Sequence, residues 1–404
     1  MAPASAPRTR NRITLEVDLA AVIEGFSSGS RATSAHRRVM QHYASPLLLG
    51  PPPSEVLLEL VVHMLTDEEA ELVQHLPPLR RRTAVDVAKR AQRPVAEVSR
   101  VLDRLAFTKM VVFCTGLERR YALLPLVPGT FEAVLMKPET SRLNAWHKKF
   151  AELFERLWDE GFMKDYAFNS LAPVRFLPDS RLSPSLFTSW PSDRLEEYLE
   201  PYDRFAIGQC QCRIAMQLTG EGCSAPTSNC VAIGPLSRLV IARGMMRPAD
   251  KAEVIEVKRQ AEQSGCVTWL ANELGARSGN VCCSCCSCCC HALRTISELN
   301  APGLASAPHF LPLKHDAACT ACGRCVAVCP TRAWTAERGQ QPVFDKPRCV
   351  GCGLCVLHCN AKALELTCAP DCRPPQDSWT SLIAKMAPGY FANATRVWIR
   401  RFIA

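Results

Sequence analysis

The sequence lacks several features that would place it in a common class. Its 404 residues contain no run of about 18 apolar residues, the length that a membrane helix needs, so we expect no membrane span. A Gly-rich dinucleotide fingerprint and a P-loop are also missing. Arg8, Arg10 and Arg12 are followed by no apolar core, so we expect a tail here and not an export signal. Charged residues make up only 22% and apolar residues 48%, which argues against disorder and predicts two to four globular domains.

Cysteine, in contrast, is abundant. The chain has 23 cysteines and is far longer than the small secreted scaffolds that disulfides hold together. Metal binding is therefore the better explanation. A cysteine binds a cluster as the thiolate, which implies a reducing compartment. We therefore expect a cytoplasmic protein.

Eight of the cysteines form two matched runs. The first extends from Cys319 to Pro330 and the second from Cys349 to Cys359, and both have the spacing C-x2-C-x2-C-x3-C. At this spacing a short loop gives three thiolates to one cubane cluster and its fourth to a second cubane. Asn360 stands where a second proline would follow, and since Asn also ends short helices we expect the change to be tolerated.

These runs closely resemble the bacterial two-cluster ferredoxins. The resemblance implies two [4Fe-4S] clusters whose ligands cross between the runs. The implied ligands are Cys319, Cys322, Cys325 and Cys359 for one cluster, and Cys349, Cys352, Cys355 and Cys329 for the other.

A second cysteine region begins upstream with Cys210, Cys212, Cys223 and Cys230. Four thiols suffice for one cluster or one tetrahedral zinc. Iron is favoured because Cys-x-Cys is tight for zinc, whose structural sites usually have Cys-x2-4-Cys. Arg213 follows directly and can donate hydrogen bonds to cluster sulfurs, raising the reduction potential. The alternative is that Arg213 is an ordinary surface arginine.

The densest cysteine segment runs from Cys282 to His291, with seven thiols in nine residues. They cannot all bind one cubane, because each of its four irons takes one thiolate; either some pack as core residues or two metal centres share the segment. We predict one [4Fe-4S] cluster here. His291 is a further candidate ligand, although a core or helix-starting histidine is more common. The predicted ligands come from Cys283, Cys285, Cys286, Cys288, Cys289 and Cys290.

Residues 54–130 have the outline of a winged helix. Thr66, Thr83 and Pro94 mark the starts of three short helices, and strands are expected at 110–113 and 121–124. Such a module binds either DNA or another protein. The DNA hypothesis would use Arg93, Arg100, Arg104, Arg119 and Arg120. Glu97 and Asp103 interrupt this basic surface, so binding to nucleic acid is not expected.

The predicted architecture is an α+β multidomain chain. A flexible tail with a short lead-in helix (1–53) precedes the winged-helix-like domain. A helical connector follows, in which Trp146, Phe150, Phe154, Leu157 and Trp158 form a core stripe. A spacer helix is expected between Arg238 and Glu273. Cys266, near its end, is interpreted as a small buried residue. The predicted domains are 54–130, winged-helix-like; 131–205, connector; 206–300, cysteine-rich iron-sulfur domain; 310–368, two-cluster ferredoxin domain; and 369–404, C-terminal tail.

The tail ends in Val397–Ile403, where two arginines stand among large apolar residues. This segment can contact a membrane surface, a partner protein or its own chain. Cys368 and Cys372 are assigned no metal.

The formal charge of +9 is weak evidence for an anionic partner. A [4Fe-4S] core bound by four thiolates carries about −2, so four clusters would bring the total to about +1.

Taken together, these motifs resemble a family of bacterial iron-sulfur proteins with a winged-helix-like N-terminus and a terminal two-cluster ferredoxin. The resemblance extends over roughly 54–366 and implies cytoplasmic electron transfer. Its residues are Leu124 to Gly129, Cys210 to Arg213, Cys223, Cys230 and Cys283 to Cys290.

We therefore expect an electron-transfer protein that passes single electrons through three or four [4Fe-4S] clusters. Since no nucleotide motif is present, the electrons must come from a redox partner protein. Two alternatives remain open: an oxidoreductase with a catalytic cluster at Cys282 to Cys290, or a redox-responsive winged-helix regulator whose DNA affinity depends on its clusters.

Overall fold

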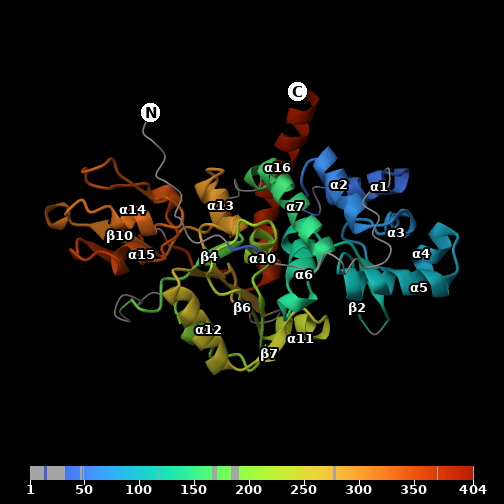
Figure 1. Cartoon of the computed structure of the whole chain (residues 1–404), viewed down its shortest axis with the longest axis horizontal. Helices are drawn as coiled ribbons and strands as arrows, with labels where there is room; N and C mark the ends of the chain where they lie inside the picture. Colours follow the sequence, from blue (N-terminus) through green and yellow to red (C-terminus); the bar gives the residue numbers. More distant parts are fainter. Residues whose placement is uncertain are drawn as a thin grey trace.

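The computed structural model describes residues 13–15, 32–45, 48, 50–116, 118–165, 171–182, 191–275, 279–370 and 372–403. Figure 1 shows three units side by side along the long axis: N-terminal helices, a central sheet with its helices, and a C-terminal unit. The predicted tail lies largely outside the described residues, and so do Arg8, Arg10 and Arg12. Within that tail, residues 34–43 form a helix whose Ala35, Val39 and Tyr43 are buried.

The N-terminal unit combines short capped helices with a small antiparallel sheet of strand order β1-β3-β2. Thr66 forms the predicted capping box with Glu69, and Thr83, predicted only to precede a helix, forms one with Asp86. The winged-helix interpretation stays a prediction, and the strands lie a few residues from the expected positions. The elements are α1 (Ser34–Tyr43), α2 (Glu55–Met64), α3 (Asp67–Val73), β1 (Arg82–Thr83), α4 (Ala84–Ala91), α5 (Val95–Arg104), η2 (Leu105–Lys109), β2 (Phe113–Thr115) and β3 (Arg120–Ala122).

The connector helices belong to the same core as the N-terminal unit. Phe150, Phe154 and Leu157 of α7 are buried in the cluster that also contains Leu57 and Leu60 of α2. The aromatic stripe is thus core, as its helical spacing predicted. The elements here are η3 (Leu126–Thr130), α6 (Phe131–Leu135), η4 (Thr140–Arg142), α7 (Ala145–Asp159) and α8 (Phe162–Asp165).

The central unit is an antiparallel sheet of order β4-β8-β9-β6-β5-β7. The sequence did not predict this sheet: 131–205 was expected to be helical, yet it contains β4. The expected spacer helix was wrong in extent, because 238–273 folds as the end of α11, then β7, α12 and β8. The elements are β4 (Val174–Phe176), η6 (Pro191–Asp193), α9 (Leu195–Leu199), β5 (Phe205–Gln209), α10 (Gln211–Leu218), β6 (Ser228–Ile233), α11 (Pro235–Ala242), β7 (Arg247–Ala249), α12 (Lys251–Gln263), β8 (Val267–Ala271), β9 (Asn280–Cys285), α13 (His291–Ser297) and η7 (Pro302–Leu304).

The C-terminal unit has an internal duplication at an offset of 30 residues. Positive φ angles recur in matched pairs: Ala321 with Gly351, Gly323 with Gly353, and Arg332 with Lys362. The hairpin expected between the cysteine runs is present as β11 and β12. The elements are β10 (Phe310–Lys314), η8 (Asp316–Ala318), α14 (Arg324–Val328), β11 (Trp334–Thr335), β12 (Val343–Phe344), η9 (Lys346–Arg348), α15 (Leu354–Leu357) and β13 (Leu364–Cys368), which pairs with β10.

The last helix, α16 (Trp379–Ile403), contains Pro388 and buries Leu382. The side chains of Val397–Ile403, which the sequence singled out for surface contact, lie outside the described part. Among the described helices, none combines the length and apolarity needed to cross a membrane.

Candidate metal centres

The pleat of β9 separates the thiols of the cysteine-dense segment. Successive side chains of a strand point to opposite faces of the sheet. Cys282 packs on the face covered by α12, in a cluster with Val254. Cys283 and Cys285 pack on the other face, in a cluster with Cys230. The strand ends at Cys285, and the turn that follows carries the remaining thiols to the start of α13.

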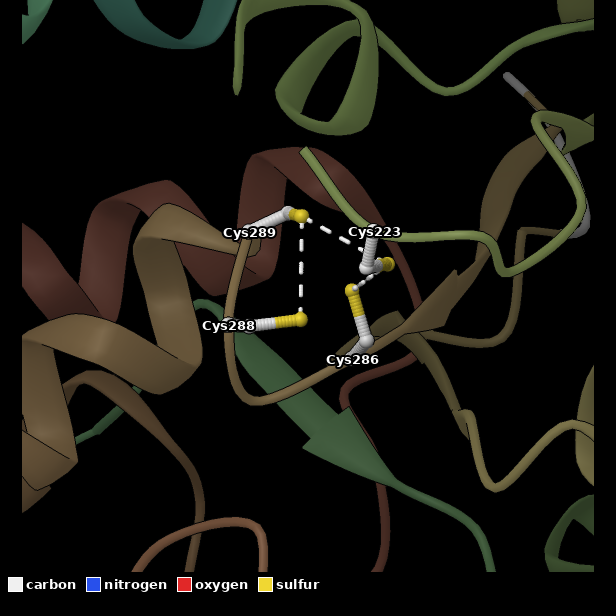
Figure 2. A group of neighbouring side chains, drawn as sticks. All are labelled: Cys223, Cys286, Cys288 and Cys289. Carbon is white, nitrogen blue, oxygen red and sulfur yellow. Dashed lines mark hydrogen bonds between the residues drawn. The ribbon is translucent and has the colours of Figure 1, made fainter. Parts of the chain in front are cut away.

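Four thiols converge where this turn meets the loop between α10 and β6. The Sγ atoms of Cys223, Cys286, Cys288 and Cys289 all lie within 4.8 Å of one another. Figure 2 shows Cys223 approaching on its own segment while the other three come from the turn. The Sγ atoms of Cys223 and Cys286 are 3.7 Å apart, as are those of Cys223 and Cys289. We refer to these four residues as the turn set.

The turn set differs from the sets predicted from sequence. Cys223 was grouped with Cys210, Cys212 and Cys230, but it joins the downstream segment instead. The prediction assumed that neighbours in sequence bind together, whereas the sheet brings two distant segments into contact. Three members are buried, and Cys288 is partly exposed.

The donors of the turn set suit an iron-sulfur cluster. Cys223, Cys286, Cys288 and Cys289 are free thiols, so no disulfide consumes these sulfurs. Contacts among the four sulfurs, helped by the nearby Arg213, lower the pKa of Cys286 well below its ordinary value, while the same contacts raise the pKa values of Cys288 and Cys289. A lowered pKa favours the thiolate, which is the form that binds metal. Soft sulfur donors of this kind select Fe-S clusters or zinc.

Arg213 of α10 lies directly behind the turn set. Its side chain is fully buried, so the surface-arginine alternative is wrong. Nη2 lies 3.3 Å from Cys286 Sγ and 3.4 Å from Cys266 Sγ, and Nη1 donates to the Pro226 carbonyl. The sequence predicted an arginine that donates to cluster sulfurs but did not predict which cysteine receives the bond. Cys266 is itself buried, as expected.

A second group of thiols lies on the other side of the segment. The Sγ atoms of Cys230 and Cys283 are 3.8 Å apart. Cys285 and Cys290 are buried in the same cluster as Cys230 and Cys283, and the neighbouring Cys290 thiol, together with burial, raises the pKa values of Cys212 and Cys285. Cys210 precedes α10, and burial raises its pKa to about 12. We call these the sheet group; its members are Cys210, Cys212, Cys230, Cys283, Cys285 and Cys290.

His291 connects the sheet group to the N-terminal unit. It begins α13; Nδ1 lies 3.3 Å from Cys212 Sγ, and Nε2 lies 2.6 Å from Glu155 Oε1 of α7. Arg294 donates to the other oxygen of Glu155 at 2.8 Å. Although burial acts in the opposite direction, His291 and Arg294 lower the pKa of Glu155 to about 2. Sequence reasoning missed Glu155, because nothing in the helical pattern of α7 marks it.

In the C-terminal unit the thiols line two small cavities. One is lined by the first three cysteines of the first run together with Cys359, and the other by the first three of the second run together with Cys329. Backbone amides of Ala333 and Ala363 donate to the crossing sulfurs of Cys329 and Cys359 at 3.1 and 3.3 Å. The grouping follows the crossed pattern that the resemblance implied.

The two runs differ in exposure. Cys322 is exposed, and hydrogen bonding from the Arg324 backbone lowers its pKa. In the second run, burial raises the pKa values of Cys349 and Cys355 to about 12. The second run also faces the central unit, because the Asp179 amide donates to the Cys352 carbonyl at 3.1 Å.

A cleft of about 890 Å³ separates the two cysteine regions. Cys223 and Cys288 of the turn set line one wall, and Cys322 and Cys329 line the other. Glu155 and Arg294 also reach this space. The cleft is therefore bordered by two candidate metal centres.

The arginines of the DNA hypothesis are mostly engaged with carboxylates. Arg93 pairs with Glu97, Arg119 with Asp103, and Arg120 with Glu118. Arg104 binds the buried Glu69 at 2.8 Å. These pairs reduce the positive charge that phosphate binding would need.

Comparison with known proteins identifies one region. A family model described as a 4Fe-4S dicluster domain matches residues 318–364. The search of curated proteins and the search of solved structures returned no match. The C-terminal unit is therefore a ferredoxin-type domain that binds [4Fe-4S], and the cysteine groups upstream point to iron-sulfur electron transfer.

Proposed function

We propose that this chain is a cytoplasmic electron-transfer protein that connects two ferredoxin-type [4Fe-4S] clusters to a further centre at the turn set. The observation that carries the proposal is the convergence of Cys223 with three thiols of a distant segment within 4.8 Å, in a chain that also contains a dicluster domain. Bound clusters would supply one-electron carriers at these positions. The protein is then a subunit or partner of an oxidoreductase.

The two ferredoxin-type clusters would be held by the crossed ligand sets. The two cavities support this assignment, since each is lined by three cysteines of one run and the last cysteine of the other. Amide donors to Cys329 and Cys359 are the kind of bond that tunes such sulfurs. Each run therefore completes the site of its partner.

The exposure of the cluster cysteines indicates where a redox partner would dock. Cys322 is exposed on the cleft that also borders the turn set, so a soluble redox partner would reach the first run there, whereas the second run packs directly on the central unit. Arg213 donates to the Cys286 sulfur and, in this proposal, raises the reduction potential at the turn set. The winged-helix-like unit would dock a protein and not nucleic acid, because its arginines are paired with carboxylates.

Iron and sulfide quantification on anaerobically purified protein, with Mössbauer and EPR spectra, tests the proposal. The two ferredoxin-type clusters account for about eight irons, and the turn set raises this to at least about twelve. A holoprotein with only about eight irons, and no further cluster signal, would remove the turn-set centre and the longer path with it.

A second candidate function is an oxidoreductase with its catalytic centre at the turn set. The observation in its favour is the 890 Å³ cleft, on which the partly exposed Cys288 opens. Concave sites with a few convergent polar groups are the usual location of substrates. Addition of cyanide to the reduced protein tests this candidate. A changed EPR signal that Cys286→Ser abolishes would support an accessible iron, and unchanged spectra would reject it.

A further inference from the structure

Eight thiols of the central unit lie outside the turn set, and six of them form the sheet group. We propose that this sheet group binds a second upstream [4Fe-4S] cluster, with Cys212, Cys285 and Cys290 as three ligands and the fourth from Cys210, Cys230 or Cys283. This inference rests on the proposed function and extends it, because it gives the central unit two adjacent metal centres instead of one.

Strand register brings the first members together. In the β6–β9 pair, Val231 lies opposite Cys282, so Cys230 lies opposite Cys283 on the next rung. Their sulfurs are 3.8 Å apart. Cys285 is two residues beyond Cys283 and points to the same face. One face of β9 therefore presents two sulfurs in a row, with a third supplied by β6.

Two helix starts add the other members. Cys212 lies in the first turn of α10, and Cys290 directly precedes α13. Cys290 packs in one buried cluster with Cys285, and its thiol is near enough to Cys212 and Cys285 to raise the pKa values of both, so three elements meet at these sulfurs. The convergence of thiols from a strand and two helix starts parallels the turn set, where a loop and a turn meet.

The surroundings of these sulfurs fit a bound thiolate. Trp269 Nε1, which can only donate, points at Cys285 Sγ from 2.8 Å. His291 Nδ1 lies 3.3 Å from Cys212 Sγ, and Glu155 holds the opposite ring nitrogen at 2.6 Å. Donors that are themselves held in place around metal-binding sulfurs are a general property of such sites.

The two sets share one segment without sharing a ligand. Cys285 and Cys290 belong to the sheet group, and Cys286, Cys288 and Cys289 to the turn set. Seven thiols in nine residues are then explained: the strand pleat and the turn direct five of them to two centres, with Cys283 beside the second. Cys282 points to the α12 face, where it packs with Val254.

Paired serine variants test the proposal in the full-length holoprotein. Wild-type protein should contain about sixteen irons. C285S/C290S should lose about four irons and one cluster signal by Mössbauer and EPR spectroscopy, and C286S/C289S should lose a different signal of similar size. Cys282→Ser is the matched control, since this cysteine lies on the same strand but faces away, and it should keep all its iron.

If C285S/C290S fails to fold, the single variant Cys212→Ser replaces it, because Cys212 is only partly buried. Cys212→Ser should perturb the signal that C286S/C289S leaves intact. Full iron retention in either test variant would overturn the inference, as would zinc in place of iron. A wild-type content of about twelve irons, with the turn-set signal present, would also overturn it while leaving the proposed function standing; about eight irons would remove both.

Discussion

The ferredoxin-type unit and the central unit both gather cysteines, but they do so by different means. In the ferredoxin-type unit eight ligand candidates lie within 41 consecutive positions of a repeated motif, from Cys319 to Cys359. In the central unit Cys223 meets Cys286, Cys288 and Cys289 only because a sheet brings two segments together. Local spacing therefore specifies the first sites, whereas tertiary packing creates the second.

The two regions also differ in what supports them. The ferredoxin-type unit has a small core around Trp334 and Leu364, in which several of the contacting residues are cysteines. The central unit has apolar clusters on both faces of a six-stranded sheet. Small domains with little core depend on metals for stability, and sheets with large cores do not.

Iron removal should produce the largest difference between the two units. Chelation under anaerobic, reducing conditions should unfold residues 310–368, because metal binding there supplies much of the folding free energy. The central sheet should keep its structure. Hydrogen exchange measured by mass spectrometry checks this: β10 and β13 should lose protection, and β6 and β9 should retain it. Equal loss in both regions would contradict the difference in core support.

Substitution of one ligand in each region should give the next largest effect. Cys286→Ser should remove about four irons and lower the stability of the central unit by about 1–3 kcal/mol, because it places a hydroxyl among buried sulfurs. Cys322→Ser should disturb only the first ferredoxin-type cluster, since Cys322 is exposed. Iron content and thermal unfolding of the two variants measure the contrast. A similar loss of stability in both would mean that burial does not separate the centres.

Arg213→Lys tests the buried donor. A lysine keeps the charge but loses the fork that reaches Cys286, Cys266 and the Ser284 carbonyl, so we expect a lower potential for one cluster and a loss of about 1–3 kcal/mol. Arg324→Lys is the control, because Arg324 lies beside the first run but is exposed. An EPR-monitored redox titration distinguishes the two. An unchanged potential in Arg213→Lys would limit Arg213 to a structural role.

The smallest expected effect concerns two glycines that the duplication relates, Gly323 and Gly353. Gly323 and Gly353 have φ angles of 71° and 73°, so alanine costs about 1 kcal/mol at either position. A Cβ at Gly353 would also lie 2.3 Å from Leu182 Cδ1, whereas at Gly323 it would meet nothing within 4 Å. Gly353→Ala should therefore destabilise the protein by about 1–3 kcal/mol more than Gly323→Ala. Denaturant unfolding of the two variants measures this difference, and equal effects would indicate that the second run does not pack on the central unit.

These contrasts explain what the sequence could predict. Capping patterns at Thr66 and Thr83 are local, and the helices begin where the patterns place them. The stripe from Trp146 to Trp158 also depends on one helix alone. The partner of Cys223, however, depends on the pairing of β6 with β9. Three of the six residues of β9 are cysteines, and their spacing does not indicate a strand. The sequence indicated that Arg213 can donate to sulfur, but only the fold shows that the Cys286 sulfur accepts the bond.

The contact between Glu155 and His291 determines how the protein can be divided for experiments. Glu155 is carried by α7, which Phe150 and Phe154 anchor in the N-terminal core. Its carboxylate holds both His291 and Arg294 of α13. A fragment that begins at the central sheet would remove Glu155 from His291, leave Arg294 only its pair with Glu298, and uncover apolar surface on α10. The shortest piece that preserves the cysteine sites must therefore include α7 and the N-terminal core in which it packs.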